Sequence, residues 1–556
     1  MKNILLPSML LLSAFSYGQN TYDMVYGVLS TKCSNSTCHS SSNPVGGRFD
    51  DTKANVYASL INGTPANAIA AAKGDKLVKI NQPYESYLLR KCGGALDADI
   101  SVNTAAGEGD AMKDISGSAL NDKEVEYIRQ WIMNGAKQTG NTVDTVIINR
   151  YYNNPNKAAF LNKPPKPANG RQVRFGPVFL PEAGSPNTER EYLLKYHMDL
   201  GDNIEVTEVN GYMNAQSHHF LLFKFQDSAS AAAQPNGIRI VSLTGGTTSF
   251  DGNKDLTGAW QDDADIVLPQ GTAMFWDRNT YLDLNYHVKN YNAPSVMPCD
   301  FYLNMVYKPR PVNTSTVEMK SALINNATLF LTPGSQTKYF NDPDNGQNET
   351  RYLWMMSSHT HKYGTGFDIH VKDNAMPNQL GTKLYDGLYR YETAFQGTTY
   401  DWEHPSVKYF DPIVPVNMKT QGIRCTTSWN NTGGSVVTFG FTTADEMQLF
   451  YYMYTNELPG SVGINEAKSN INASITSYPN PSNGNATIAI NSELNETVEL
   501  TLVNLQGQVV GAISTLLKNR ENKLALNDIN SNLAAGIYML KVKGQTISAE
   551  SKLIVN

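Results

Sequence analysis

The stretch Ser217-His218-His219-Phe220-Leu221-Leu222-Phe223-Lys224-Phe225 decides how the central part of this chain folds. It is a short run dominated by apolar and aromatic residues, which is the pattern of a β-strand. Comparable segments, such as Asp265–Leu268 and Val436–Phe441, recur between about residues 170 and 458 and alternate with Gly, Asn and Pro, whereas long helical periodicity is scarce. The sequence therefore predicts a large all-β region here.

The flanking regions differ from this β region in composition. Upstream, Asn121 and Glu124 form a capping-box pattern ahead of an apolar helical face that Gly135 ends, which predicts a mainly helical N-terminal domain. Lys163-Pro164-Pro165-Lys166-Pro167 cannot be helical and predicts a linker or an extended edge, and Lys308-Pro309-Arg310-Pro311 predicts a junction between two sandwiches. The expected divisions are 1–18 for a signal peptide, 19–139 for the helical domain, 140–169 for the linker, 170–310 and 311–460 for two all-β sandwich domains, and 474–556 for a small β-sandwich domain.

Length, charge and hydropathy exclude several classes of protein. A chain of 556 residues is long enough for three or four domains. With 45 Lys and Arg against 51 Asp and Glu, its net charge of −6 leaves no basic surplus for a nucleic acid. The only long apolar run, Ile4–Ala14, follows Lys2, precedes the small-residue exit Ser16-Tyr17-Gly18 and is too short to span a bilayer. It predicts a signal peptide cut after Gly18 and hence export; an uncleaved anchor is the weaker alternative.

Cysteine and histidine are adjacent in Cys33-Ser34-Asn35-Ser36-Thr37-Cys38-His39. Two thiols can join haem vinyl groups through thioether bonds while the neighbouring histidine supplies an axial ligand to iron. The usual motif has two residues between the cysteines and this one has four, so a Cys33–Cys38 disulfide beside an ordinary histidine is the alternative.

The chain around this motif resembles class I cytochrome c domains over most of residues 20–139, including the closing helix. The resemblance implies a small all-α domain with one covalently bound haem c, held by Cys33, Cys38 and His39. It also implies Met112 as the second axial ligand, with packing in the core or at the surface as the alternative for that side chain. Cys92 has no assigned partner.

Five of the nine histidines fall into three short strings: His218-His219, His287 and His359-Thr360-His361. On a strand, His-x-His points both rings to one face because side chains repeat every second residue, and this makes a ready two-ligand metal site. Adjacent His218 and His219 would point to opposite faces of a regular strand, so joint ligation requires a bulge, a strand end or a loop. Taken alone, either string is more often surface decoration than a metal site.

A fourth motif, Ala444-Asp445-Glu446-Met447, follows the three histidine strings along the chain and stands just before an aromatic strand. His-His, His, His-x-His and Asp-Glu-Met in this order resemble the copper type II, ascorbate-dependent monooxygenases, the family of dopamine β-monooxygenase and peptidylglycine α-hydroxylating monooxygenase. The resemblance covers about residues 170–458 and all six copper-ligand positions, and it implies two jelly-roll-like sandwiches. The implied ligands are His218, His219 and His287 for one copper ion and His359, His361 and Met447 for the other.

The ligand types suit the chemistry that the resemblance implies. Imidazole holds copper in both oxidation states, whereas a thioether favours Cu(I), the state that binds dioxygen. Oxygen activation is therefore expected at the catalytic set of His359, His361 and Met447, and electron storage at the all-histidine set. In the family, each turnover takes two electrons, inserts one oxygen atom into a substrate C–H bond and releases the other as water.

Other positions follow the family pattern or depart from it. Cys425 matches a family disulfide cysteine, and the resemblance implies a bridge to Cys299. Gln448 stands where the family usually has a cysteine, and Ser357 stands where peptide-hydroxylating members carry an arginine for the substrate carboxylate, which puts peptidylglycine in doubt. Tyr451 matches a substrate-side tyrosine, with core packing as the alternative. The remaining histidines of the β region match no ligand position: His197, His370 and His404.

A final change in composition at Ser474–Gly484 opens a stretch of about eighty residues with new strand patterns. Its motifs Tyr478-Pro479-Asn480-Pro481, Leu502–Val510, Leu533–Val542 and Lys552–Val555 resemble, in this order, type A sorting domains of the type IX secretion system. The resemblance implies export through the periplasm and across the outer membrane of a Gram-negative bacterium, with release or attachment to the cell surface. A plain β accessory domain is the alternative.

Two functions remain open on this basis. The first is a secreted dicopper monooxygenase that hydroxylates a C–H bond of an unknown organic or peptide substrate with dioxygen, taking electrons from ascorbate, a redox protein or its own haem domain. The second is a non-catalytic double sandwich that binds a substrate or glycan, fused to a cytochrome with a separate electron-transfer role. Under both, the type IX secretion machinery is a partner, and neither nucleic acid nor a membrane span is expected.

Overall fold

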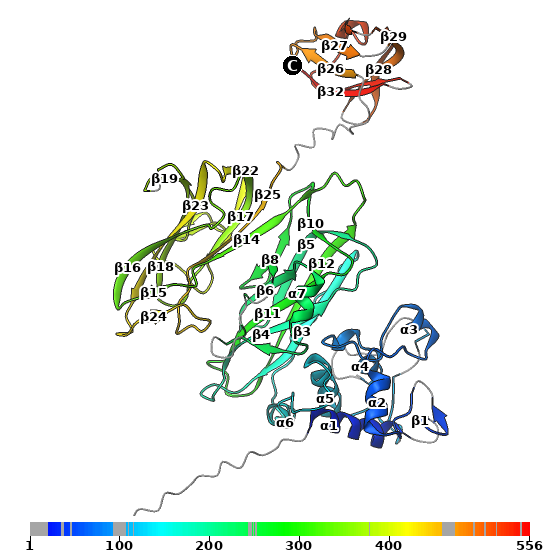
Figure 1. The fold of residues 1–556 in the computed structure, drawn as a ribbon, viewed down its shortest axis with the longest axis vertical. Coiled ribbons are helices and arrows are strands. Elements are labelled where there is room, and N and C mark those ends of the chain that lie inside the picture. Colours follow the sequence, from blue (N-terminus) through cyan, green and yellow to red (C-terminus); the bar gives the residue numbers. More distant parts are fainter. Residues whose placement is uncertain are drawn as a thin grey trace, which may run out of the picture. The chain divides into compact units, whose positions relative to one another are not determined.

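Figure 1 shows the fold in a computed structural model of the chain. The chain divides into two compact units, residues 1–458 and 459–556. Among the described residues, no helix combines the length and the apolar character that a membrane span requires. The expected signal peptide lies outside the described residues, which are 20–34, 38–44, 47–92, 107–108, 111–114, 116–242, 247, 250, 253–376, 378–458, 473–492, 495–504, 507–518, 520–544 and 547–556.

The N-terminal part of the first unit is mainly helical, as the sequence predicts. The capping box of Asn121 and Glu124 is formed at the start of α5, and Ile128 and Trp131 on its apolar face are fully buried. One short hairpin interrupts the helices, so the region is not purely α. The elements are α1 Thr21–Val28, the π-helical turn η1 Leu29–Cys33, β1 His39–Ser40, β2 Asn43–Pro44, α2 Lys53–Leu60, α3 Ala68–Ala72, the 3-10 turn η2 Pro83–Glu85, α4 Tyr87–Cys92, α5 Asp122–Met133 and α6 Thr145–Asn153.

Helix α6 lies inside the segment 140–169 that the sequence predicts to be a linker, so that prediction is wrong for its first half. The side chain of Asp144 caps the helix, and Ile148 and Tyr151 are buried on its inner face. The ring of Tyr151 packs 5.1 Å from that of Phe179 on the first sheet, which gives this short helix its tertiary support. The proline-rich half of the segment is extended, as predicted.

The first β part is a sandwich of two sheets. One sheet has the strand order β13-β10-β5-β12-β3 with β9 beside β5, and the other has the order β7-β4-β11-β6-β8. Phe220 of one sheet stacks on Phe301 of the other with a centroid distance of 3.5 Å, so the core lies between the sheets. The elements are β3 Gly170–Leu180, β4 Glu189–His197, β5 Ile204–Met213, β6 Ser217–Phe225, α7 Ser228–Ala233, β7 Arg239–Ile240, β8 Lys254–Trp260, β9 Ala264–Val267, β10 Thr272–Trp276, β11 Tyr281–Lys289, β12 Met297–Pro309 and β13 Val317–Glu318.

The second β part is also a sandwich, with sheets ordered β14-β25-β17-β22 and β16-β23-β18-β19. Its core includes Phe450 and Tyr452 from one sheet and Ile423 and Cys425 from the other. The predicted strand Val436–Phe441 is regular only at β24, after which Phe439 forms an isolated bridge with Glu446. The elements are β14 Lys320–Asn325, β15 Phe330–Leu331, β16 Gly334–Asn341, β17 Thr350–His359, β18 Gly364–Asp373, β19 Leu380–Asp386, β20 Tyr389–Arg390, β21 Phe395–Gln396, β22 Lys408–Asn417, β23 Gln421–Asn431, β24 Val437–Thr438 and β25 Leu449–Thr455.

The two sandwiches and the helical part are joined into the first unit by specific contacts. Met355 and Tyr451 of the second sandwich belong to the same buried cluster as the core of the first. On the helical side, the amide of Asn81 donates to the carbonyl oxygen of Lys195 at 3.0 Å, and that of Gln82 donates to the carbonyl oxygen of His197 at 2.6 Å. The helical part is therefore anchored to strand β4.

The second unit is a small β-sandwich of two sheets, ordered β26-β27-β30 and β29-β28-β31-β32. Its core gathers Ile488 and Ile490 from one sheet and Leu500 and Leu540 from the other. The predicted small C-terminal β domain is thus present. The elements are β26 Ala473–Tyr478, β27 Thr487–Ser492, β28 Glu496–Asn504, β29 Val509–Leu517, β30 Arg520–Ala525, the 3-10 turn η3 Leu526–Asp528, β31 Gly536–Lys543 and β32 Ser548–Val555.

Candidate metal centre

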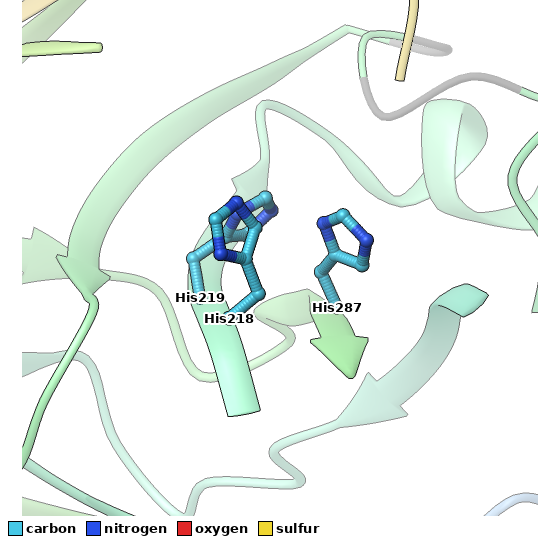
Figure 2. Close-up of side chains that lie close together, drawn as sticks. All are labelled: His218, His219 and His287. Carbon is cyan, nitrogen blue, oxygen red and sulfur yellow. The ribbon is translucent and has the colours of Figure 1, made fainter. Parts of the chain in front are cut away.

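Three histidines of the first sandwich are brought together by a β-bulge. In the pairing of β6 with β11, His219 lies opposite His287 and Ser217 lies opposite Val288, so His218 is an extra residue on its strand. The bulge turns two adjacent side chains to the same side, which a regular strand cannot do. Figure 2 shows the rings of His218 and His219 side by side, with His287 facing them from the neighbouring strand.

The geometry of this triad fits a metal ion. One nitrogen from each of His218, His219 and His287 can be chosen so that all three lie within 4.8 Å of one another. The three residues are 3%, 9% and 1% exposed, and Nε2 of His218, both nitrogens of His219 and Nδ1 of His287 have no hydrogen-bond partner. Buried polar atoms are normally satisfied, so this convergence of unpartnered nitrogens favours a bound ion. Imidazole donors suit copper.

One carboxylate of β4, that of Glu189, supports the triad directly, and a second, that of Glu191, lies nearby. Nε2 of His287 lies 3.0 Å from a carboxylate oxygen of Glu189, and Nε2 of His219 lies 3.8 Å from a carboxylate oxygen of Glu191. Burial would raise the pKa of Glu189, but hydrogen bonds from His287 and Tyr291 outweigh it and lower the pKa to about 2. A carboxylate on the outer nitrogen fixes the ring and its tautomer. Neither glutamate is predicted as a site residue from the sequence, although their Glu-x-Glu spacing places them on one face of a strand.

The second predicted ligand set lies at the edge of the second sandwich. His359 is the last residue of β17, and His361 follows it in a loop rather than on the strand, with the two ring centroids 5.2 Å apart. Met447 is 6% exposed and lines the same cavity as His359. His361 is not part of the described cavity lining, and its ring adjoins that of His359. Imidazole and thioether groups are donors that copper accepts.

A buried glutamate ties these two segments together. The carboxylate of Glu446 accepts hydrogen bonds from the backbone N–H groups of His361 at 3.0 Å, Tyr363 at 2.7 Å and Met447 at 3.2 Å, and from the indole N–H of Trp429 at 3.1 Å. Burial raises its pKa to about 7 although these donors oppose the rise. Glu446 belongs to the sequence motif Ala444-Asp445-Glu446-Met447, but its role as a hydrogen-bond acceptor becomes visible only in the packing of these loops.

The two ligand sets lie next to each other. The ring centroid of His359 is 6.4 Å from that of His218 and 5.9 Å from that of His219, little more than the 4.9–5.3 Å within the first triad. Burial lowers the pKa of His218, His359 and His361, to about 4 for His361, and the neighbouring rings lower it further. The rings are therefore neutral near pH 7, which is the form that binds a metal.

A cavity of about 760 Å³ adjoins both sets. Its lining includes His219 from the first triad and His359 and Met447 from the second. Ser357 and Tyr451 also line it. Tyr451 belongs to the apolar core cluster as well, so it both packs and faces the cavity.

The predicted Cys299–Cys425 disulfide is not formed, and this prediction is corrected. Both thiols are free and fully buried. Cys299 belongs to the core of the first sandwich and Cys425 to that of the second, so each packs as an apolar residue. The side-chain amide of Gln448 accepts a hydrogen bond from the amide of Asn326 and donates to the carbonyl oxygen of Lys338 and the hydroxyl of Thr427.

The histidines that match no ligand position lie outside both sets. The ring of His197 stacks on Tyr281 at 4.2 Å, and His370 lies on β18. The side chain of His404 is 53% exposed, and it lines the cavity near Asp262.

The predicted haem residues lie around one apolar cluster of the helical part. Cys33 and Cys92 are buried in that cluster, and Met112 packs against it. Burial, followed by the neighbouring Cys38, raises the pKa of Cys33 to about 11. Nδ1 of His39 lies 3.3 Å from the carbonyl oxygen of Gly47, a contact typical of axial histidines. Residues 35–37 of the motif lie outside the described part. Cys33 and Met112 share this cluster, and thiols, an imidazole and a thioether are the donor types that a haem c takes.

Comparison with known proteins defines the second unit. Residues 476–556 match the family model described as "Secretion system C-terminal sorting domain". These residues form a type IX sorting domain, which interacts with the secretion machinery and marks the protein as secreted or displayed at the cell surface.

The other two comparisons concern curated proteins and solved structures. The comparison with curated proteins found no match. Among solved structures, a β-glucuronidase from Ruminococcus gnavus in complex with uronic isofagomine is similar at 12% identity and a TM-score of 0.12, over 45% of this chain and 38% of that one. A second structure of this enzyme gives the same identity and TM-score over 39% of its chain. The chain thus spans well under two thirds of those enzymes.

Proposed function

We propose that this protein is a secreted dicopper monooxygenase that hydroxylates a C–H bond of an organic substrate with dioxygen. The observation that carries the proposal is the convergence of unpartnered, buried nitrogens of His218, His219 and His287 within 4.8 Å. A second set with the donors that favour Cu(I) lies at the same cavity. The order of all six residues along the chain resembles that of the copper type II monooxygenases.

The chain's own residues divide the work between the two sets. Bound copper would supply electron storage at the all-histidine set and dioxygen reduction at the set of His359, His361 and Met447. Glu189 holds the outer nitrogen of His287, which directs Nδ1 toward the other two rings. Glu446 holds the backbone of His361 and of Met447 in one frame. The mostly apolar lining of the cavity would bury the hydrocarbon part of a bound substrate.

We further propose that the helical domain binds one haem c through Cys33, Cys38 and His39, with Met112 as the second axial ligand, and passes electrons to the copper sites. The anchoring of this domain to β4 supports the proposal, because β4 also carries Glu189 and Glu191. Ascorbate or a separate redox protein is the alternative electron donor.

The competing function is binding without catalysis. The cavity supports this function, because a volume of about 760 Å³ suits an organic ligand whether or not a metal is present. The two functions differ in metal content, and copper binding therefore decides between them.

Copper per chain, measured by elemental analysis after reconstitution and desalting, tests the proposal. We expect two copper ions in the wild type and one in His218→Ala and in Met447→Ala. His370→Ala, which removes a histidine outside both sets, is the matched control and should keep two. A wild-type protein without copper would leave only the binding function.

Two further measurements test the assigned roles. Reductant-driven dioxygen consumption should be lost in Met447→Ala, and unchanged consumption would show that oxygen activation lies elsewhere. A reduced-minus-oxidised spectrum should show a c-type haem that Met112→Ala alters, and its absence would remove the haem domain from the mechanism.

A further inference from the structure

The bulge that turns His218 toward the other two rings of the triad is one of two registers open to β6 and β11. In a regular continuation of their pairing, His218 would lie opposite Val288 and face the core, and Ser217 would face the other side of the sheet. In the structure Ser217 lies opposite Val288, so Ser217 faces the core and His218 is the extra residue. The position of the Ser217 side chain therefore distinguishes the two registers.

Tyr286 lies on the core side of β11, next to His287 in the sequence and on the opposite face of the strand. It is fully buried. Its ring packs against Phe220 of the same sheet at a centroid distance of 5.9 Å and against Phe301 of the other sheet at 6.1 Å. Aromatic neighbours thus hold the ring, whereas the buried hydroxyl requires polar partners.

The hydroxyl of Tyr286 has two such partners. It donates a hydrogen bond to the backbone carbonyl oxygen of Asp300, which lies on β12 in the opposite sheet, at 2.7 Å. Its oxygen lies 2.7 Å from the hydroxyl oxygen of Ser217. Because the phenol has one proton and directs it to Asp300, Ser217 is the donor of the second hydrogen bond. The hydroxyl therefore connects the first residue of β6 with the opposite sheet.

Other hydrogen bonds fix the surroundings of this hydroxyl. The backbone N–H of Ser217 donates to the carbonyl oxygen of Asn214 at 2.9 Å, which closes the turn before β6. The backbone N–H of Asp300 donates to the side-chain oxygen of Asn214 at 2.5 Å, and Nε of Arg174 donates to the carboxylate of Asp300 at 2.9 Å. The acceptor of the Tyr286 proton is thus held in place by bonds that do not involve Tyr286.

The hydrogen bond between Ser217 and Tyr286 is available in only one of the two registers. In the regular register, the hydroxyl of Ser217 would lie on the face of the sheet opposite to that of Tyr286. The imidazole of His218 would then enter a core composed mostly of apolar side chains. Both effects favour the bulge, and the first of them depends on the Tyr286 hydroxyl.

We propose that Tyr286 is a positioning residue for the all-histidine set: its hydroxyl holds Ser217 in the core and thereby keeps His218 turned toward the other two histidines. The consequence for copper rests on the proposed function, whereas the hold on the bulge does not. Tyr286 faces away from the metal-binding nitrogens and acts on them through Ser217 and the backbone that follows it.

Titration of the copper-free, full-length protein with Cu(II) in competition with a chelator tests this role. Tyr286→Phe keeps the ring and removes only the hydroxyl. In the Met447→Ala background, which leaves the all-histidine set intact, we expect copper binding to weaken about tenfold, which corresponds to about 1.4 kcal/mol. In the His287→Ala background, which leaves the other set intact, the affinity should not change. Unchanged affinity of the all-histidine set would overturn the proposal.

Variants at two other positions show whether the effect passes through one hydrogen bond. Ser217→Ala should weaken copper binding about as much as Tyr286→Phe, and the double variant no further, because both changes remove the same bond. Ser217→Thr keeps a hydroxyl and should bind copper as tightly as the wild type. Tyr192→Phe, at the tyrosine opposite Tyr286 in the pairing of β4 with β11, is the matched control and should also bind normally. Additive losses in the double variant would refute the positioning role.

A measurement without copper separates this proposal from the proposed function. In nuclear magnetic resonance spectra of the copper-free protein labelled at histidine, Tyr286→Phe should shift the ring signals of the triad and leave those of His370 and His404 in place. If the signals shift but the wild type binds no copper, the hold on the bulge stands and the monooxygenase proposal fails. If the wild type binds two copper ions and Tyr286→Phe changes neither signals nor affinity, the positioning role is wrong and the monooxygenase proposal stands.

Discussion

Replacement of Glu446 should lower the free energy of unfolding of the second sandwich, because its carboxylate accepts four hydrogen bonds there. The residue is fully buried, and one carboxylate oxygen accepts from His361, Met447 and Trp429 while the other accepts from Tyr363. Glu446→Gln can keep the first oxygen, but it places an amide donor against the N–H of Tyr363. One buried donor then loses its acceptor, at a cost of about 1–3 kcal/mol.

Glu446→Ala removes all four acceptor contacts at once. At about 1 kcal/mol or more for each orphaned donor, the loss is roughly 4 kcal/mol, a large part of the 5–15 kcal/mol typical of a domain. The assay is urea unfolding of the copper-free protein, followed by tryptophan fluorescence because Trp429 lies in the network. Glu403→Ala, which removes a partly exposed ion pair with Lys289, is the control and should cost less than about 1 kcal/mol.

The reasoning on Glu446 fails if the alanine variant loses less than about 1 kcal/mol, since the four bonds would then contribute nothing measurable. A second readout separates positioning from stability. Glu446→Gln should remain folded at 25 °C yet bind copper more weakly at the set of His361 and Met447, while the all-histidine set keeps its copper. Equal weakening at both sets would instead indicate a general loss of structure.

Three further predictions concern the metal sites and the thiols. With both sets loaded with Cu(II), the close approach of His359 to His219 should produce spin coupling in electron paramagnetic resonance; two uncoupled signals would contradict this arrangement. Glu189→Gln should weaken copper binding at the all-histidine set about 10–100-fold, and an unchanged dissociation constant would exclude the support of His287. Burial raises the pKa of Cys425 to about 12 and also raises that of Cys299. Neither thiol should therefore react with iodoacetamide at pH 8 until the protein is denatured. A peptide pair linked by a disulfide in the mass spectrum would refute their free state.

The strands could be predicted from the sequence where local composition alone determines them. The predicted segment His219–Phe225 lies within β6, and Asp265–Leu268 overlaps β9, because an apolar, aromatic run has few stable alternatives to a half-buried strand. Helix α6 escaped prediction because its support comes from Phe179, a residue on another element. Tertiary contacts of this kind override a sequence that reads as a turn-rich linker.

The candidate site was predictable in its residues but not in its supports. Because His218 and His219 are adjacent, the sequence predicts that a bulge, a strand end or a loop is needed if both are to bind one metal ion. The structure has a bulge at this point, where β6 pairs with β11. Glu189 and Glu446 could not be assigned because their roles depend on which backbone or ring nitrogens the fold brings to them. The predicted bridge between Cys299 and Cys425 is wrong because the two thiols are buried in two separate hydrophobic cores.

The junction between the sandwiches is the part of the structure on which the proposed chemistry depends most. Under the proposed function, each sandwich supplies one of the two predicted ligand sets, and electron storage and dioxygen reduction would then depend on both. The hydroxyl of Tyr291 donates to Glu189 at 2.5 Å and lies 3.2 Å from that of Thr443, four residues before Met447. The support of His287 in the first sandwich is thereby linked to the loop that carries a ligand in the second. A change at this link should alter the distance between the sets before it alters either set, and the spin coupling predicted above would report it.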